Sequence, residues 1–294
     1  MGPTVWRLHM TQQDHVKVPD RCLFCVRDNV AGMGWGVPPH EALDWAEYAS
    51  RAGRVDRNVI RLRQNVRPDD LVWSRDTKGK YWLARVIGEW EYRYSQGHID
   101  ADIHNVRACE WRPVGDLIRV PGTIRNRFIR GQTLESIDSD TIRSFSMDLY
   151  NRLCGQNRYG LSLDVNVDLF SLFDPDDCED LVGIFLQLQG WLLYPGTCKK
   201  GTQGFEFVVR NHQTGKMGAA QVKQGSQELC VSEYEDFDGD VFLFQTEAKY
   251  FGAEAKKTST TLLDPDQMRR FCIDNLKIMT PTIQWWVEWT ERQR

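Results

Sequence analysis

The chain of 294 residues lacks several features that would assign it directly to a class of protein. No apolar run approaches the roughly 20 residues that a membrane-spanning helix needs, so we expect no membrane partner. The start MGPTVWRLHM has neither the regions nor the cleavage site of a signal peptide. Trp6 stands where a myristoylation motif has Ser or Thr. Together these absences predict a cytoplasmic protein.

The eight cysteines also lack a complete metal-binding pattern. Cys22 and Cys25 form a CxxC, but no second CxxC or HxxxH follows to complete four zinc ligands. The sequence around them, CLFCVRD, predicts a buried strand. His104 has no second histidine beside it, so an H-N-H nuclease is not expected either. Scattered cysteines in a chain of this length are typical of reduced thiols in the cytosol.

Charge and tryptophan are unevenly distributed along the chain. Residues 1–135 carry a balance of +4, whereas the remainder carries −8. Seven of the eleven tryptophans lie within the first 111 residues. Nucleic-acid-binding domains tend to be basic, and only the first half leans that way. An acidic second half suits a site that gathers carboxylates around a divalent cation.

Residues 1–135 show short strand patterns with one helix. We expect strands over 4–10, 20–28 and 104–115, and a helix over 39–53 that Gly53 ends. The clearest signal is an alternating strand over 70–75, a turn at Lys78-Gly79, and a returning strand over 80–90. Many short strands with one helix predict a small, strongly bent, mostly β barrel.

Residues 136–170 are expected to form a helical connector between two domains that touch. Its helix is capped by Ser139 or Asp140 and ends at Gly155. In residues 171–294 a helix near Glu179 carries apolar side chains at helical spacing. They are Leu181, Ile184, Phe185 and Leu188, with Val182 and Leu186 beside them. A hairpin over 204–225, a strand over 240–246 and two terminal helices follow, which predicts an α/β domain with a mixed central sheet.

The hairpin GFEFVVRNHQTGKMGAAQVKQG places polar residues among apolar ones. Gln221 and Lys223 are two apart in one strand, so they share a face. A two-residue turn at Gln213-Thr214 would place Glu206 opposite Gln221, and one at Thr214-Gly215 would place it opposite Lys223. A three-residue loop would instead separate the three groups. The grouping on one face therefore depends on the register, with a solvated strand face as the alternative.

A carboxylate, an amide oxygen and an ammonium on one face suit phosphodiester hydrolysis. Glu206 can bind Mg²⁺, which prefers oxygen ligands, and the Gln221 oxygen or a neighbouring carbonyl could add a ligand. A bound metal ion acidifies water and offsets the charge that grows on the phosphate. Lys223 can orient that water or neutralise the phosphate.

These residues carry a resemblance. EDLVGIFLQLQGW, GFEFVVRN and AAQVKQG together resemble the core of the PD-(D/E)XK nucleases, and within them the Mrr-like restriction endonucleases that have Q-x-K. The resemblance covers residues 176–250. It implies that Glu179 is the helix carboxylate, Glu206 the metal-binding acid, and Gln221 and Lys223 the Q-x-K pair, with Mg²⁺ or Mn²⁺ as cofactor. The family usually has Asp where this chain has Glu206. A capping box with Asp176 is the alternative role for Glu179.

The first domain carries a second resemblance, on the stretch DDLVWSRDTKGKYWLARVIGEW and on HNVRACEW. It is similar to the PUA/EVE-like modules of modification-dependent restriction enzymes, which hold a flipped, modified base in an aromatic pocket. Trp35, Trp73 and Trp82 are the expected pocket walls, with core packing as the alternative. The same stretch is also similar to PWWP and Tudor-like barrels, which seat methyl-lysine in aromatic cages.

The sequence therefore predicts a modification-dependent DNA endonuclease of prokaryotic restriction and antiviral defence. Its partner would be double-stranded DNA with a modified base, and cutting both strands would require a homodimer. Two alternatives stay open. One is a catalytically inactive protein that binds modified DNA, and the other is an aromatic-cage reader of methylated peptide.

Overall fold

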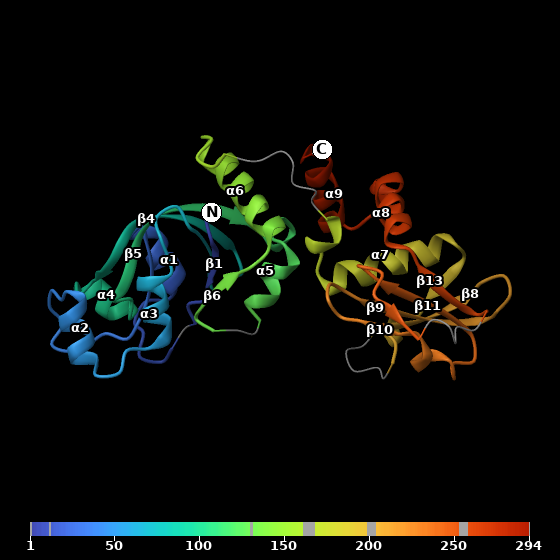
Figure 1. Cartoon of the computed structure of the whole chain (residues 1–294), viewed down its shortest axis with the longest axis horizontal. Helices are drawn as coiled ribbons and strands as arrows, with labels where there is room; N and C mark the ends of the chain where they lie inside the picture. Colours follow the sequence, from blue (N-terminus) through green and yellow to red (C-terminus); the bar gives the residue numbers. More distant parts are fainter. Residues whose placement is uncertain are drawn as a thin grey trace. The chain divides into compact units, whose positions relative to one another are not determined.

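The computed structural model describes residues 2–11, 13–129, 132–160, 168–198, 204–252 and 258–293. The chain divides into two compact units, Met1–Val165 and Asn166–Arg294 (Figure 1). Both units combine helices with a sheet, so the fold is mixed α/β. None of the helices in the described ranges is long and apolar enough to cross a membrane.

The first unit is built on a six-stranded sheet in the order β2-β5-β4-β3-β1-β6. Its strands are β1 Val5–Leu8, β2 Val30–Met33, β3 Leu71–Arg75, β4 Tyr81–Tyr92, β5 Asn105–Gly115 and β6 Leu134–Ile137. The predicted β3–β4 hairpin is confirmed, and Gly79 takes the left-handed conformation (φ 81°) that its turn needs. No pairing among the described residues joins the edge strands β2 and β6, so the expected closed barrel is not seen.

Helices cover the first sheet more fully than the sequence predicts. They are α1 Arg21–Arg27, α2 Trp45–Ala52, α3 Arg57–Gln64, α4 Gln96–Ala101, α5 Gly122–Arg127 and α6 Asp140–Cys154, with the short 3-10 helix η1 Leu117–Arg119. The strand expected over 20–28 was wrong, because this segment is the helix α1. Asp20 caps it by accepting a hydrogen bond from the Leu23 amide. Cys22 and Cys25, three residues apart, both point into the core.

The helix expected in the connector, α6, packs on the first sheet. Ser139 caps it and Gly155 ends it in the left-handed conformation, as the sequence predicts. Its residue Ser146 accepts a hydrogen bond from the indole of Trp73 on β3 at 3.0 Å. The helix contacts β1, β4 and β5, so it belongs to the first unit rather than standing between two domains (Figure 1).

The second unit has a five-stranded sheet in the order β13-β11-β9-β8-β7. Its strands are β7 Trp191–Leu193, β8 Phe207–Asn211, β9 Met217–Lys223, β11 Asp240–Gln245 and β13 Thr260–Leu263. β13, β11 and β9 run parallel, whereas β9, β8 and β7 run antiparallel, which confirms the mixed sheet. β10 Leu229–Cys230 and β12 Tyr250–Phe251 form a separate parallel pair.

Three helices accompany this sheet: α7 Pro175–Leu188, α8 Pro265–Asp274 and α9 Pro281–Gln293 (Figure 1). Short 3-10 helices are η2 Leu169–Ser171, η3 Pro195–Thr197, η4 Val231–Tyr234 and η6 Leu276–Ile278. Leu181 and Phe185 of α7 are buried as predicted, and Phe185 meets Phe271 of α8 edge-on at 5.1 Å. Leu188 was wrongly expected in this stripe, since the helix ends there and its side chain is 59% exposed.

Candidate active site

The β8–β9 hairpin fixes the position of Glu206 relative to Gln221. Phe207 pairs with Ala220 and Arg210 with Met217, which places Glu206, just before β8, across from Gln221. The Glu206 amide donates to the Ala220 carbonyl at 3.0 Å, so the backbone pairing continues past the strand end. This is the register expected from a turn at Gln213-Thr214. The connection is longer than two residues, because the Asn211 amide donates to the Lys216 carbonyl and four residues lie between them.

Both Q-x-K side chains meet the same oxygen of Glu206. Gln221 Nε2 donates to Glu206 Oε1 at 2.6 Å, and Lys223 Nζ lies 3.8 Å from that oxygen. Gln221 is buried, whereas the side chains of Glu206 and Lys223 keep 30% and 35% of their surface exposed. The carboxylate and the ammonium can therefore reach a ligand from solvent, while the amide holds the carboxylate in place.

Glu179 lies one turn inside α7 and is electrostatically coupled to Glu206. Burial, and next the negative charge of Glu206, raise the pKa of Glu179 from 4.5 to about 7. Asp176, Asp180 and Asp174 add to the effect. Two carboxyl groups that repel each other in a half-buried setting are the arrangement that a divalent cation relieves.

Glu179 does not cap the helix. The capping box joins Asp174 and Asp177: the Asp177 amide donates to Asp174 Oδ1 at 2.7 Å, and the Asp174 amide donates to Asp177 Oδ2 at 3.0 Å. The alternative pairing of Glu179 with Asp176 was wrong because α7 begins at Pro175. The Glu179 carboxyl is therefore left for another role.

Gln224, which sequence reasoning missed, ties the end of β9 to the segment before α7. Its Nε2 donates to the carbonyls of Phe170 and Phe173, both at 2.8 Å. These bonds hold the strand that carries Gln221 and Lys223 against the segment that leads into Glu179. Its position directly after Q-x-K could have drawn attention to Gln224. Its partners could not be predicted, because they lie about 50 positions away in the sequence.

Three of these four residues fit a divalent cation. Glu206 and Glu179 offer carboxylate oxygens, and Gln221 adds an amide oxygen, which are the ligands that Mg²⁺ and Mn²⁺ accept. Within the described ranges no group of three or more His, Cys, Asp or Glu side chains is arranged to hold a metal ion, so this site would rely on two carboxylates and an amide oxygen. Cys22 and Cys25 do not form one, since both are buried and burial raises their thiol pKa values, that of Cys22 to about 12.

The predicted tryptophan pocket of the first unit does not form as one site. Trp73 is fully buried between the sheet and α6, where its ring stacks near Phe145, so it cannot line an open pocket. Trp82 is half-buried, and its indole donates to Asp76 Oδ2 at 3.3 Å. Trp35 alone of the three is exposed, at 41%, and it lines a cavity of about 340 Å³.

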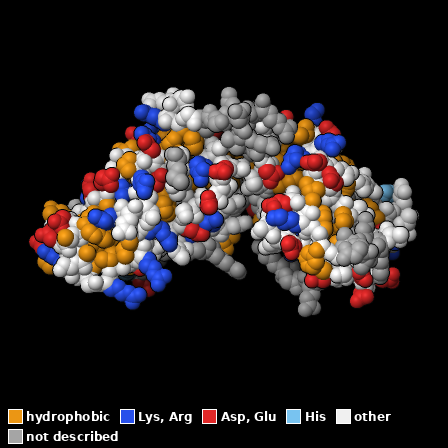
Figure 2. Space-filling model, in the orientation of Figure 1, with side chains coloured by type: hydrophobic (Ala, Val, Ile, Leu, Met, Phe, Trp, Pro, Cys, Tyr) orange, Lys and Arg blue, Asp and Glu red, His pale blue; other side chains and the backbone are white. Residues whose placement is uncertain are grey.

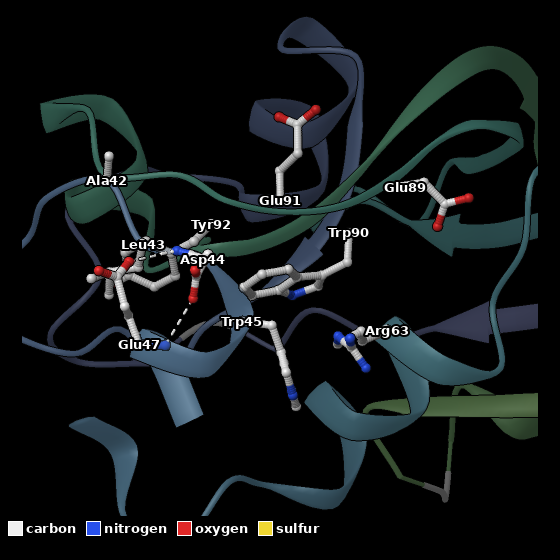
Figure 3. A pocket seen from close by; sticks show the side chains of 10 residues that line it. All are labelled: Ala42, Leu43, Asp44, Trp45, Glu47, Arg63, Glu89, Trp90, Glu91 and Tyr92. Carbon is white, nitrogen blue, oxygen red and sulfur yellow. Dashed lines mark hydrogen bonds between the residues drawn. The ribbon is translucent and has the colours of Figure 1, made fainter. Parts of the chain in front are cut away.

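A second aromatic cavity, of about 730 Å³, was not predicted (Figure 3). Trp90 meets Trp45 edge-on at 5.2 Å, and the Arg63 guanidinium lies 4.4 Å from the Trp45 ring centre. Figure 3 shows the ends of Glu89 and Glu91 pointing away from these two rings. A ring face that a methylammonium could take is thus already covered by a cation of the chain itself.

His104 has a structural environment. Its ring stacks on His40 at 4.8 Å and on Tyr92 at 5.6 Å, and its Nδ1 contacts the Arg93 carbonyl at 2.9 Å. Burial lowers the pKa of His104 below its ordinary value. Figure 2 shows basic and acidic side chains interspersed over the visible face of both units.

No family model matches the chain, and no curated protein sequence matches it. Among solved structures, the chain is similar to the DNA modification-dependent restriction endonuclease AspBHI, with a TM-score of 0.26 and 12% sequence identity. The match covers 90% of this chain and 80% of that one.

Proposed function

We propose that the chain is a metal-dependent DNA endonuclease whose second unit hydrolyses the phosphodiester backbone. The observation that carries this proposal is the meeting of Gln221 Nε2 and Lys223 Nζ at one oxygen of Glu206. Glu179 extends the set, since the charge of Glu206 contributes to its raised pKa. Residues that cluster and perturb one another in this way are more typical of a reactive site than of a solvated strand face.

Each residue has a distinct role in the proposed reaction. Glu206 and Glu179 would hold Mg²⁺ or Mn²⁺, with Gln221 fixing the Glu206 carboxylate through its hydrogen bond or adding an oxygen ligand. When bound, the metal ion acidifies a water and offsets the charge on the phosphate. Lys223 presents a half-exposed ammonium beside the carboxylate, where it attracts the scissile phosphate and stabilises its growing negative charge.

The test is DNA cleavage by the Lys223→Ala variant. We expect the variant to lose about 100-fold or more of the cleavage rate with modified DNA and Mg²⁺, because one stabilising cation at the reacting group is removed. Lys216→Ala is the matched control: it removes an exposed lysine just before the start of β9, whose partner is Asp240 at 2.7 Å, and should cleave like the wild type. Equal cleavage by Lys223→Ala and the wild type would remove the proposed site.

We propose that the first unit reads the modified base of double-stranded DNA and that the enzyme acts as a homodimer. One site per chain cuts one strand, so two copies are needed for both strands. Light scattering on the full chain bound to DNA should give two copies. A monomer that cuts both strands would refute this. The cellular role would be cytoplasmic restriction of phage DNA, which expression in phage-infected cells would test.

Two rival functions make different predictions. An inactive binder would bind modified DNA but show no metal-dependent cleavage by the wild type. A reader of methylated peptide would prefer peptide to DNA. The position of Arg63 over the Trp45 ring counts against this reader, because the ring is already paired with a cation.

A further inference from the structure

The arginine stretch, residues 51–67, concentrates positive charge in one part of the first unit. Its sequence RAGRVDRNVIRLRQNVR holds six arginines and one aspartate, a balance of +5. Residues 1–135 as a whole have a balance of +4, so the positive excess of the first half lies entirely in this stretch. The one aspartate, Asp56, caps α3 by accepting a hydrogen bond from the Asn58 amide at 2.7 Å. A local concentration of one charge sign indicates a partner of the opposite sign.

Buried side chains fix α3 on the first sheet. Leu62 is buried, and the buried Arg107 of β5 donates from Nε to the Leu62 carbonyl at 2.8 Å and from Nη2 to the Arg63 carbonyl at 2.7 Å. Both carbonyls lie in the last turn of the helix, where no intrahelical amide is available. Arg107 also pairs with Glu89 at 3.1 Å, so this carboxylate, which lines the cavity beside Arg63, already has a counter-ion. A helix fixed in this way loses little conformational freedom when a ligand binds to it.

Four of the six arginines face solvent or an aromatic ring. Arg54, Arg57 and Arg67 are exposed, and no ion pair to them is seen in the described part of the chain. Arg63 lies over the Trp45 ring, 4.4 Å from its centre (Figure 3). A ring orients a guanidinium without neutralising its charge. Guanidinium groups in this state can bind a phosphate through two parallel hydrogen bonds.

The remaining two arginines are engaged within the first unit. Arg51 pairs with Glu41. Arg61 Nη1 donates to Gln132 Oε1 at 2.9 Å and to the Leu134 carbonyl at 2.6 Å. Replacing either of them would disturb the fold as well as any binding, so both stay unchanged in the test below.

We infer that the arginine stretch binds phosphate groups of the duplex DNA backbone. The contacting side chains are Arg54, Arg57, Arg63 and Arg67. The inference rests on the proposed function, because DNA is the ligand there. α3 has eight residues and is about 12 Å long, while each DNA strand presents one phosphate about every 3.4 Å, so the stretch can meet several consecutive phosphates. Such contacts fix the position of the duplex without reading its bases.

The test is equilibrium binding of the full chain to a duplex with 5-methylcytosine and to its unmodified counterpart, over a range of salt concentrations and in EDTA to prevent cleavage. We expect Arg54→Ala, Arg57→Ala and Arg67→Ala, combined in one variant, to weaken binding of both duplexes about tenfold or more at about 0.1 M salt. The slope of the logarithm of the binding constant against the logarithm of the salt concentration should decrease by about 2–3, because each lost phosphate contact removes about 0.9.

Two further variants serve as controls. Arg27→Ala, Arg119→Ala and Arg158→Ala, combined, make the same change of charge at exposed positions of the first unit outside the stretch, and should keep the wild-type affinity and slope. Lysine at the three varied positions of the stretch keeps the charge and should restore most of the affinity. All the varied side chains are exposed, so the melting temperatures should stay close to that of the wild type.

The outcomes separate this inference from the proposed nuclease. If the alanine variant of the stretch binds both duplexes like the wild type, or if the control variant weakens binding equally, the inference is overturned. The same holds if the lysine variant binds as weakly as the alanine variant, or if the wild type prefers poly-glutamate to the duplex. Cleavage in Mg²⁺ that depends on Lys223 would still stand. Salt-dependent binding that only the alanine variant of the stretch weakens, in a wild type that cleaves nothing, would support this surface and refute the nuclease.

Discussion

Three polar residues of the second unit contact or sense one carboxylate, that of Glu206, whereas the three tryptophans proposed for the first unit lie in three different environments. Gln221 and Lys223 meet Glu206, and Glu179 is perturbed by it. Trp73 lies in the core, Trp82 is half-buried, and Trp35 lines a cavity. Polar residues that lie together can be recognised from their spacing in the sequence. A tryptophan suits a packed core as well as a binding pocket, so the sequence alone does not distinguish the two.

The largest expected effect is the loss of stability when the buried Trp73 is replaced. Trp73→Ala should lower the free energy of unfolding by about 3–5 kcal/mol, because it opens a cavity between the sheet and α6 and leaves Ser146 without its donor. Urea unfolding of the full chain measures this. A loss below about 1 kcal/mol would show that Trp73 is not part of the core.

The raised pKa of Glu179 predicts a pH-dependent stability of the metal-free chain. The folded chain keeps this proton up to about pH 7, whereas the unfolded chain releases it near 4.5. The stabilisation is therefore complete below the lower value and is lost as the pH rises through about 7. Glu179→Gln should lack this loss in melting curves recorded in EDTA. Exposed Glu228→Gln is the control, and parallel curves for Glu179→Gln and the wild type would contradict the prediction.

The smallest expected effect is that of Trp35→Ala on stability. Its side chain is 41% exposed, so the free energy of unfolding should change by about 0.5 kcal/mol or less. The comparison with Trp73→Ala in the same unfolding experiment distinguishes the exposed Trp35 from the buried Trp73. A large loss with Trp35→Ala would mean that the ring serves packing after all.

The sequence predicts the grouping of Glu206, Gln221 and Lys223 because strand pairing has a period of two and the hairpin allows few registers. The choice of Glu179 came from the resemblance to the PD-(D/E)XK nucleases, which implies a carboxylate near the start of this helix. The surroundings of the tryptophans could not be predicted in this way. Trp73 is buried because α6, some 70 positions later, covers its face of β3. Asp102 and Arg21 line the same cavity as Trp35, and only the tertiary fold brings these distant positions together.

Predictions that rest on neighbouring residues alone were correct for one helix and wrong for another. Ser139 and Gly155 bound α6 as expected because caps are local chemistry. The segment around Cys22 and Cys25 was read as a strand, since a short apolar run does not distinguish a buried strand from a buried helix. The cap at Asp20 decides for the helix.

The most direct test of the central claim is DNA cleavage by Glu206→Gln, which keeps the shape of the side chain but removes its charge. We predict a loss of about 100-fold or more in rate with Mg²⁺, because a metal-binding carboxylate and the partner of Lys223 are lost together. Glu247→Gln, at an exposed glutamate paired with Lys249, should cleave like the wild type. Equal rates for Glu206→Gln and the wild type would contradict the assignment of the active site to this hairpin.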